Sequence, residues 1–291
     1  MSDSYPHHPI TYRPFETRDV AAAYRLSTEV RWPHRAEDWD FVSNIGEGFV
    51  AEDASGVLGT ALCWKYGSET ASLGMVIVSP AQQSRGIGRK LMELLLEALG
   101  RRVTLLHATP AGQPLYEKLG FEKIGTLHQH QSAAFQAPAI DLPPNETLRP
   151  VTPDDTPRLA ELASRAGGLD RSAVLPALLE IAEGVALERD GALVGFALFR
   201  PFGRGHAIGP VVALDTPESA AARAKALISY WLAKNTGAFT RIDMPDGGGL
   251  SSWLEEIGLP RVDTVVKMVR NGVLTADPQT REFGIINQAL G

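Results

Sequence analysis

The sequence predicts an α+β fold built from two tandem copies of one unit, each a mixed and mostly antiparallel sheet flanked by helices. Three observations support this prediction: a faint internal repeat, the same order of helical and strand patterns in each copy, and a glycine-rich turn found in the first copy only. The length of 291 residues suits two domains of about 140 residues better than one.

The internal repeat determines the predicted architecture. The segment Thr11-Tyr12-Arg13-Pro14-Phe15, followed by Asp19, recurs as Thr147-Leu148-Arg149-Pro150-Val151, followed by Asp155. Further matches keep the same order and nearly the same spacing: Glu47-Gly48 with Glu183-Gly184, Gly59 with Gly195, Gly74-Met75-Val76 with Gly209-Pro210-Val211, and 115–120 with 253–258. Because a proline-rich stretch separates the copies, we predict domains at 1–136 and 147–291 and a linker at 137–146.

Hydrophobic periodicity and turn residues predict the elements of the first copy in order. Strands are expected over 10–13, 48–53, 57–66, 71–78 and 102–108, and helices over 18–29, 36–44, 86–99 and 114–119. Gly120 ends the last helix, and a final pair of strands is expected after Phe121.

Composition excludes several classes of function. A net charge of −6 argues against a nucleic-acid or membrane-surface partner, since such partners favour a basic face. Cys63 is the only cysteine, which excludes an intrachain disulfide and a cysteine-based zinc site. The start of the chain lacks the pattern of a signal peptide, and no apolar run approaches the roughly 18 residues of a membrane span. We therefore expect a cytoplasmic protein.

The turn Gln83-Ser84-Arg85-Gly86-Ile87-Gly88 lies between an apolar strand and an amphipathic helix. Free N–H groups at the start of a helix form an anion site, and glycines let a pyrophosphate approach the backbone closely. Arg85 and Arg89 can add positive charge. A dinucleotide-binding fingerprint would need a third glycine and a downstream acid, and a P-loop would need Lys-Ser/Thr, so neither pattern fits.

In this context the order Gln-x-x-Gly-x-Gly resembles motif A of the GNAT acetyltransferases. The later segment 108–121, which ends in Leu115-Tyr116-Glu117-Lys118-Leu119-Gly120-Phe121, resembles motif B of the same family. The two motifs stand in family order and extend the resemblance over residues 10–130, whereas only the repeat extends it over 146–291. The whole chain resembles tandem GNAT proteins with an altered C-terminal half.

The resemblance implies an acetyl-CoA-dependent N-acetyltransferase in which the acceptor amine attacks the thioester directly. The pantetheine arm would pair with the strand before the turn, and backbone N–H groups from Arg85 to Arg89 would hold the pyrophosphate. The residues expected at the cofactor are Val76, Ile77, Val78, Gln83, Ser84, Arg85, Gly86, Ile87, Gly88, Arg89, Thr109 and Tyr116. Thr109 stands where the family often has asparagine. Tyr116 takes the position of the general acid that protonates the departing thiolate, the alternative being a packing aromatic.

The general base is not evident, because the strand over 71–77 carries no acid where many relatives have a glutamate. Glu29, His34 and Asp38 lie in the region that usually lines the acceptor pocket and are candidates acting through water. Alternatively, the amine arrives neutral and needs no base.

Several residues are candidates for binding the acceptor. Trp32 and Trp39 form either the aromatic wall of a pocket or the anchor of a helical hairpin. His130 lies on a late strand near the expected acceptor side. His128 and His130 share one strand face but lack a third ligand, so no metal site is expected.

The second copy has lost the chemistry. Over 214–225, where motif A should recur, neither glycine is present and Glu218 would repel a phosphate. Leu254 stands in place of Tyr116. We expect this copy to fold alike without acetyl-CoA and to serve a structural or substrate-shaping role. Arg204 and His206, in a glycine-rich stretch, would face an acidic part of the acceptor or form a flexible hairpin tip.

Three functions remain open at this point. The first is acetyl transfer to the primary amine of a small molecule, the second is acetylation of a protein lysine or N-terminus, and the third is non-catalytic sensing of acyl-CoA. An acidic chain with an aromatic acceptor loop and a covering second domain favours the first. We expect a monomer or a homodimer.

Overall fold

The computed structural model describes residues 9–139, 142, 144–215 and 220–291. Contacts divide the chain into two compact units: a first unit of residues 1–64 with 73–100, and a second unit of residues 65–72 with 101–291. These units differ from the two sequence copies, because residues 65–72 and 101–136 of the first copy belong to the second unit. The domain boundaries drawn from the repeat stay a prediction.

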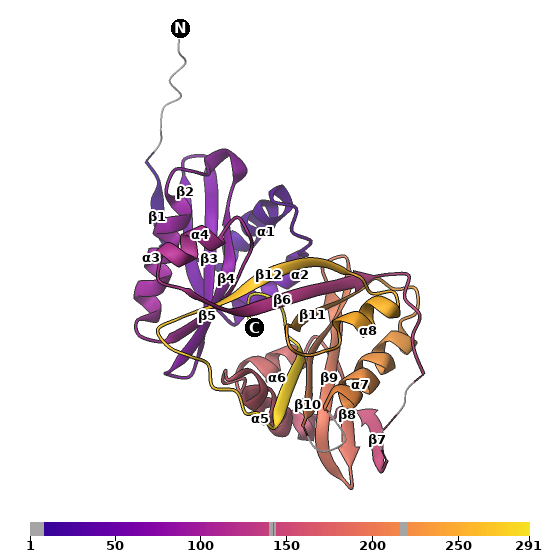
Figure 1. Ribbon diagram of the computed structural model, residues 1–291. Helices are drawn as coiled ribbons and strands as arrows, with labels where there is room; N and C mark the ends of the chain where they lie inside the picture. The colour runs from indigo at the N-terminus through magenta and orange to yellow at the C-terminus, as the bar shows by residue number, and fades with distance from the viewer. Residues whose placement is uncertain (1–8, 140–141, 143, 216–219) are drawn as a thin grey trace. The chain divides into compact units, whose positions relative to one another are not determined.

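The first unit contains a sheet and three helices (Figure 1). Its elements are β1 (Thr11–Pro14), α1 (Val20–Glu29), α2 (Ala36–Asn44), β2 (Glu47–Asp53), most of β3 (Gly56–Tyr66), the end of β4 (Thr70–Val78) and α3 (Ile87–Leu99). β1 pairs with β2 and β2 with β3, both antiparallel. α1 packs on α2, and α3 packs on β2 through an apolar stripe that includes the buried Leu91 and Leu95.

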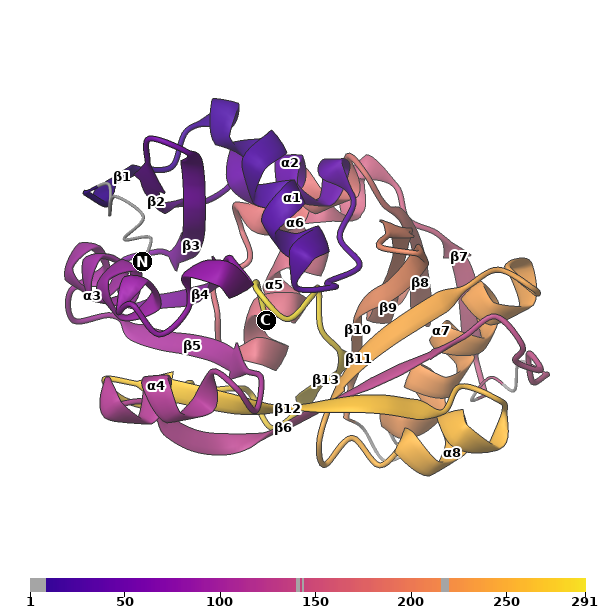
Figure 2. The ribbon, with the colours of Figure 1, turned by 90° about the horizontal axis from the view of Figure 1, so that it is seen from above.

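The second unit is a larger mixed sheet with helices on both faces (Figure 2). Its elements are β5 (Val103–Ala108), α4 (Gln113–Lys118), β6 (Glu122–Ser132), β7 (Glu146–Pro150), α5 (Thr156–Gly167), α6 (Val174–Leu179), β8 (Glu183–Arg189), β9 (Ala192–Phe202), β10 (Gly205–Leu214), α7 (Ala220–Lys234), β11 (Thr240–Pro245), α8 (Ser251–Glu256), β12 (Arg261–Arg270) and β13 (Thr280–Gly284). The start of β4 pairs in parallel with β5. The order continues as β12, β6, β11, β10, β9, β8 and β7, and β13 pairs with β10.

The two copies exchange strands at the centre of this sheet. β12, from the second copy, lies between β5 and β6 of the first copy and is antiparallel to both. On its other side β6 pairs with β11 of the second copy. The prediction of a final strand pair within the first copy is therefore wrong, since β6 is the only strand there after α4 and its partners come from the second copy. Prolines at 138, 143 and 144 lack a backbone N–H and do not suit a returning strand.

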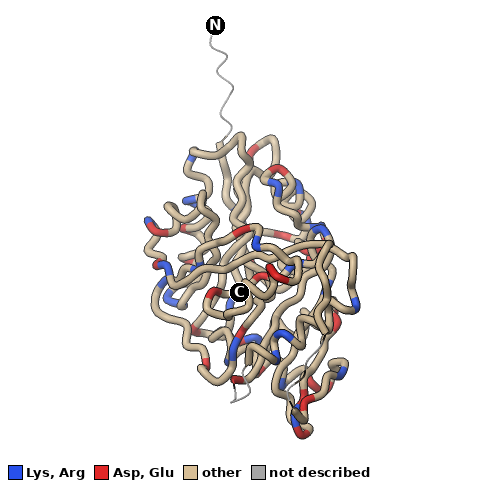
Figure 3. The backbone as a smooth tube through the Cα atoms, turned by 45° about the vertical axis from the view of Figure 1, so that its right-hand side comes forward, with Lys and Arg blue, Asp and Glu red and all other residues tan. Residues whose placement is uncertain are grey.

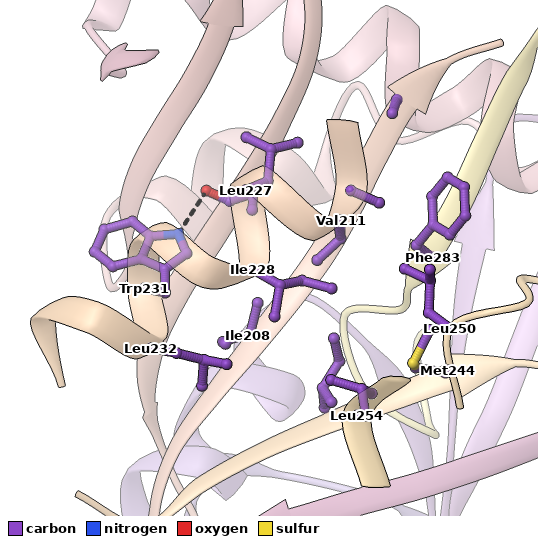
Figure 4. Close-up of a cluster of buried hydrophobic side chains, with 14 of the residues drawn as sticks. Ile208, Val211, Leu227, Ile228, Trp231, Leu232, Met244, Leu250, Leu254 and Phe283 are labelled. Atoms are coloured by element: carbon purple, nitrogen blue, oxygen red, sulfur yellow. Dashed lines mark hydrogen bonds between the residues drawn. The ribbon is translucent and has the colours of Figure 1, made fainter. Parts of the chain in front are cut away.

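The core of the second unit lies between α7 and the sheet (Figure 4). Ile228 and Leu232 of α7 point toward Ile208 of β10, and all three are buried. Trp231 is buried too, and its indole N–H donates to the carbonyl of Ala197 at 3.3 Å. α5 covers the opposite face of β9 and β10, so both faces of these strands are buried, as their continuous apolar runs require.

The segment after β13 is held by side chains from distant parts of the second unit. The carbonyl of Leu290 accepts hydrogen bonds from the Tyr66 hydroxyl and the Arg171 guanidinium, both at 2.8 Å. Arg200 donates to the Ile286 carbonyl at 2.8 Å, and His107 Nδ1 lies 2.8 Å from the Gln288 carbonyl. Burial lowers the pKa of His107 to about 4, so its ring is neutral and Nδ1 carries the donated proton.

The repeat reappears as a pair of matching ion clusters. In the first unit Arg13 holds both oxygens of Asp19 and also bonds Glu52. In the second unit Arg149 holds both oxygens of Asp155 and forms an ion pair with Glu188. In both clusters the aspartate also accepts the backbone N–H three residues earlier, which caps a short 3-10 helix. The conserved spacing of Arg-Pro and Asp in the two copies therefore reflects one local structure used twice.

A buried ion pair distinguishes the second copy. Glu146 of β7 accepts a hydrogen bond at 2.8 Å from Nε of Arg223 in α7, and both side chains are fully buried. Arg223 also donates to the carbonyl of Leu214 at 2.8 Å. Leu91 lies next to Gly59 in the first copy, and Leu227 lies next to Gly195 in the second, so the two leucines are equivalent. With the same offset of 136 residues, Arg223 corresponds to Ile87 and Glu146 corresponds to Ile10. Two charges thus occupy positions that are apolar in the first copy.

We predict that Arg223→Ile lowers the free energy of unfolding by about 3 kcal/mol, because it leaves the Glu146 carboxylate buried without its partner. The double variant Glu146→Ile/Arg223→Ile, which restores the residues of the first copy, should recover most of that loss. Urea unfolding of the wild type and the two variants measures both effects. A double variant as unstable as the single one would contradict the assigned role of the pair.

Candidate functional site

The glycine-rich turn of the first unit links the end of β4 to α3. The chain passes through a 3-10 turn at Pro80–Gln82 and then adopts positive φ at Ser84 (63°) and Gly86 (80°). Gln83 closes the turn by donating from its side-chain amide to the carbonyl of Val78 at 3.2 Å. α3 starts at Ile87 directly after Gly86, as the sequence predicts.

The start of α3 is open to an anion. Within the described residues nothing accepts a hydrogen bond from the backbone N–H of Ile87, Gly88 or Arg89, as expected for the first turn of a helix. A Cβ on Gly86 would meet no atom within 4 Å, so this glycine is required by its φ and not by crowding. The helix dipole and open N–H groups make this turn fit a phosphate or pyrophosphate.

The backbone of β4 has an irregularity that was not predicted from the sequence. Met75 has a φ of 52° in the middle of the strand, a left-handed conformation that costs a residue with a side chain roughly 1–2 kcal/mol. The Thr60 hydroxyl donates to the Met75 carbonyl at 2.8 Å and helps to hold it. In the second copy β10 also loses its register, between Ile208 and Val211. One feature of the sequence is consistent with both irregularities: the match between Gly74-Met75-Val76 and Gly209-Pro210-Val211 differs by one residue from the spacing of the rest of the repeat.

Tyr116 lies on α4 in the second unit. Its ring contacts the backbone at Gly112, where a Cβ would lie 2.9 Å from the ring, and meets Phe121 edge-on at 6.1 Å. Its hydroxyl makes no hydrogen bond within the described residues, which leaves its proton available to a ligand. Burial disfavours the phenolate and raises the pKa of Tyr116 to about 12. The Thr109 hydroxyl accepts the N–H of Gly112 at 3.3 Å and so shapes the loop before α4.

The candidate bases of the first unit differ in their contacts. Asp38 is buried, pairs with Arg35 at 2.8 Å and caps α2 through the Arg35 N–H. His34 meets the rings of Trp32 and Trp39 edge-on, at 5.7 and 6.3 Å. The Glu29 side chain is exposed, and its carboxylate accepts the Ser79 hydroxyl at 2.8 Å. Glu29 is therefore joined to the end of β4, directly before the turn.

Trp39 has the contacts of a packing residue. It is fully buried, its indole N–H donates to the Ser27 hydroxyl at 2.9 Å, and its ring stacks on Phe15. Trp64 is also buried and donates to the carbonyl of Val42 at 2.9 Å. The two indoles anchor α2, in line with the helical-hairpin interpretation. A role for Trp32 and Trp39 in acceptor binding stays a prediction.

The second unit holds the remaining predicted residues. Arg204 stacks over Phe239 at 4.8 Å, and His206 stacks on Phe199 at 4.7 Å. His130 is buried against Ser251 and the carbonyl of Leu259. Leu254, which replaces Tyr116 in the second copy, is fully buried, whereas Glu218 lies outside the described residues. No group of three or more His, Cys, Asp or Glu among the described residues is arranged to hold a metal.

The high pKa of Tyr116 predicts a pH effect on stability. The unfolded chain loses this proton near the ordinary value of 10.0, while the folded protein keeps it to about 12. The wild type should therefore lose stability relative to Tyr116→Phe as the pH rises between these values, by about 1 kcal/mol at about pH 11. Unfolding of both proteins in denaturant at about pH 8 and about pH 11 measures this. If the stability difference between the wild type and Tyr116→Phe does not change with pH, the pKa of Tyr116 in the folded protein has its ordinary value.

The chain is similar in sequence and in structure to known acetyltransferases. One model of the acetyltransferase (GNAT) domain matches residues 44–123, and a second model with the same description matches residues 159–284. The chain is 27% identical to the uncharacterized N-acetyltransferase YitH of Bacillus subtilis (strain 168), over 94% of this chain and 95% of that one. A candidate acetyltransferase from Pyrococcus horikoshii has a similar structure, with a TM-score of 0.79, 21% identity and coverage of 100% and 99% of the two chains. A tandem GNAT protein from the clavulanic acid biosynthesis pathway has a TM-score of 0.63 at 15% identity, over 91% of this chain and 99% of that one.

Proposed function

Because the chain belongs to the GNAT acetyltransferase family and carries two GNAT domains, we propose that it transfers an acetyl group from acetyl-CoA to the primary amine of a small molecule. The open N–H groups at the start of α3 carry this proposal. The pyrophosphate of acetyl-CoA requires hydrogen-bond donors that have no other acceptor, and these N–H groups fit that requirement. Arg85 and Arg89 beside them add charge, and the Val76 to Val78 backbone is proposed to pair with the pantetheine arm.

In the proposed reaction the neutral amine attacks the thioester carbonyl, a C–N bond forms, and the C–S bond breaks. The departing thiolate takes the proton of the Tyr116 hydroxyl, and the amide nitrogen gives up its extra proton to the Tyr116 phenolate through water, which restores the tyrosine. The contacts of Tyr116 support this role, because its hydroxyl has no partner among the described residues and its proton is retained at neutral pH. A Tyr116 committed to packing alone would more often satisfy its hydroxyl within the protein.

Among the three candidate bases the contacts favour Glu29. Asp38 is engaged by Arg35 and by the cap of α2, so removing it would mainly disturb the helix. Glu29 is exposed and bonds Ser79 at the end of β4, which leads into the cofactor turn. We propose that Glu29 takes a proton from the ammonium form of the acceptor, directly or through water, and so produces the neutral amine that attacks. The alternative, in which the amine arrives neutral, predicts no loss of activity on removal of Glu29.

The acceptor is proposed to be a small amine. The chain is acidic overall, and Figure 3 shows Lys and Arg interspersed with Asp and Glu along the backbone. A mixed surface of this kind does not favour nucleic acid or an anionic membrane, and no described helix is long and apolar enough to cross a bilayer. A protein lysine or N-terminus remains the second acceptor class, and an acyl-CoA sensor the non-catalytic alternative.

The second copy is proposed to bind no acetyl-CoA. Near the start of its helix α7, the buried Arg223 is committed to Glu146 and the Leu214 carbonyl. The glycines that open the turn in the first copy are replaced by Ala222 and Ala224. We propose that this copy supports the first one structurally and shapes the acceptor side.

The first test of the function uses the full chain, acetyl-CoA and a pooled library of primary amines, with free thiol and product mass as readouts. Thiol release that needs an amine supports the proposed reaction. Tyr116→Phe should lower turnover by about 100-fold while acetyl-CoA affinity stays close to the wild-type value. Tyr230→Phe, a tyrosine on α7 far from motif B in the sequence, is the matched control and should keep full turnover. Tight acetyl-CoA binding without thiol release for any acceptor would instead establish the sensor.

A second test measures binding stoichiometry by calorimetry. One acetyl-CoA should bind per chain. Gly86→Val should abolish this binding, because a β-branched side chain disfavours the positive φ and fills the space in front of the turn. Ala222→Val, at the corresponding position of the second copy, should leave the stoichiometry at one. Two molecules bound per chain would overturn the assignment of the second copy.

A further inference from the structure

A serine and a histidine from different copies form a hydrogen-bonded pair in the second unit. Nε2 of His130, on β6, lies 2.7 Å from the hydroxyl of Ser251, the first residue of α8. Nδ1 of His130 lies 2.9 Å from the carbonyl of Leu259. The imidazole is fully buried, while Ser251 is only partly buried. The strand exchange creates this pair, because β6 of the first copy lies beside β11, which leads into α8.

The partners of His130 determine where its proton lies. A carbonyl oxygen can only accept, so Nδ1 must carry the hydrogen toward Leu259. Burial lowers the pKa of His130 and keeps the ring neutral, which leaves Nε2 with a lone pair. The Ser251 hydroxyl must therefore donate its hydrogen to Nε2. This is the arrangement in which a histidine acts as general base toward a serine nucleophile, with the Leu259 carbonyl holding the tautomer.

Ser251 lines a pocket, and His130 bonds it from outside the pocket lining. The pocket encloses about 570 Å³, its open mouth included, and is lined by His128, Ser251, Ser252 and the Met244–Leu250 loop. His128 Nδ1 lies 3.5 Å from the Ser251 hydroxyl, on the pocket side of the pair. Gly247 and Gly249 have positive φ and nothing within 4 Å of an added Cβ, so this side of the loop is open. Ser251 is therefore the member of the pair that a small molecule in the pocket can contact.

We propose that Ser251, activated by His130, is a nucleophile that accepts the acyl group of small carboxylic esters. The Ser251 oxygen attacks the ester carbonyl carbon, an O–C bond forms, and the hydroxyl proton moves to Nε2 of His130. The bond to the alcohol then breaks, and the departing alkoxide takes that proton back. Water then attacks the acyl-serine carbonyl carbon and gives one proton to Nε2 of His130. The bond to the Ser251 oxygen breaks, that oxygen takes the proton back from His130, and the carboxylic acid leaves. Each cycle consumes one ester and one water and restores the neutral pair.

This site does not depend on acetyl transfer, since none of its residues belongs to the cofactor turn or to motif B. Ser251 is also a plausible helix-start residue, but a serine that only begins α8 would have no need of a buried imidazole aligned with its hydroxyl. The two roles differ in what they predict. A structural serine reacts no faster than its exposed neighbour Ser252, whereas an activated one reacts first.

The test uses the full chain with p-nitrophenyl acetate and no acetyl-CoA. Release of p-nitrophenolate is followed by absorbance, and acid-quenched samples are mapped by peptide mass spectrometry. The wild type should carry one acetyl group on Ser251 and turn over the ester. Ser251→Ala should abolish both signals, and His130→Gln should slow acylation by about 100-fold. Ser172→Ala, which changes an exposed serine outside the pocket lining, should behave like the wild type.

Thermal unfolding of each variant accompanies these measurements, so that a lost signal is assigned to chemistry only in a folded protein. If His130→Gln does not fold, the proposal is tested by the ester turnover of Ser251→Ala and by the position of the acetyl group in the wild type. The proposal is overturned if Ser251→Ala releases p-nitrophenolate at the wild-type rate, if the acetyl group maps to other residues, or if folded His130→Gln acylates Ser251 as fast as the wild type. Failure here leaves acetyl-CoA binding and amine acetylation unaffected, so it is distinct from a failure of the proposed function.

Discussion

Backbone pairing of β12 with β5 and β6 is the constraint on which the second unit depends. A strand inside a sheet must satisfy its N–H and C=O groups on both sides, and β6 finds both of its partners in the second copy. The register runs from Val266 opposite Ala108 to Arg270 opposite Thr104 on one side of β12. Because of this pairing, one continuous sheet positions both α4, which carries Tyr116, and the Ser251–His130 pair. The strands of this sheet come from both copies.

Most local elements could be predicted from the sequence, because their signals are local. The apolar spacing of Leu91, Leu95 and Leu99 is enough to place α3, and Gly86 marks its start. The repeat singled out Arg13 with Asp19 and Arg149 with Asp155, but it did not predict the ion pairs that they form. The neighbour of β6 could not be predicted, since pairing between distant strands leaves no pattern in either strand alone. The same holds for Glu146 and Arg223, two charged residues that a single copy would place in solvent and that become buried only as partners.

The candidate site was predictable where a motif has a strict chemical requirement. Positive φ and open N–H groups restrict the glycine-rich turn before α3 to a recognisable sequence pattern, and that turn has the expected backbone conformation. The φ of 52° at Met75 could not be predicted, because a methionine side chain does not signal a left-handed backbone. Trp39 shows the converse case: a residue type typical of binding pockets is equally suited to a core, and only its burial distinguishes the two.

The strand exchange also bears on how the chain is made. A ribosome delivers β5, α4 and β6 early, but β12, which must enter between them, follows nearly the whole second copy. Until then the facing edges of β5 and β6 remain unpaired on the nascent chain and can bind other strands. The ordering of motif B should therefore be one of the last events of synthesis, completed after β12 leaves the exit tunnel.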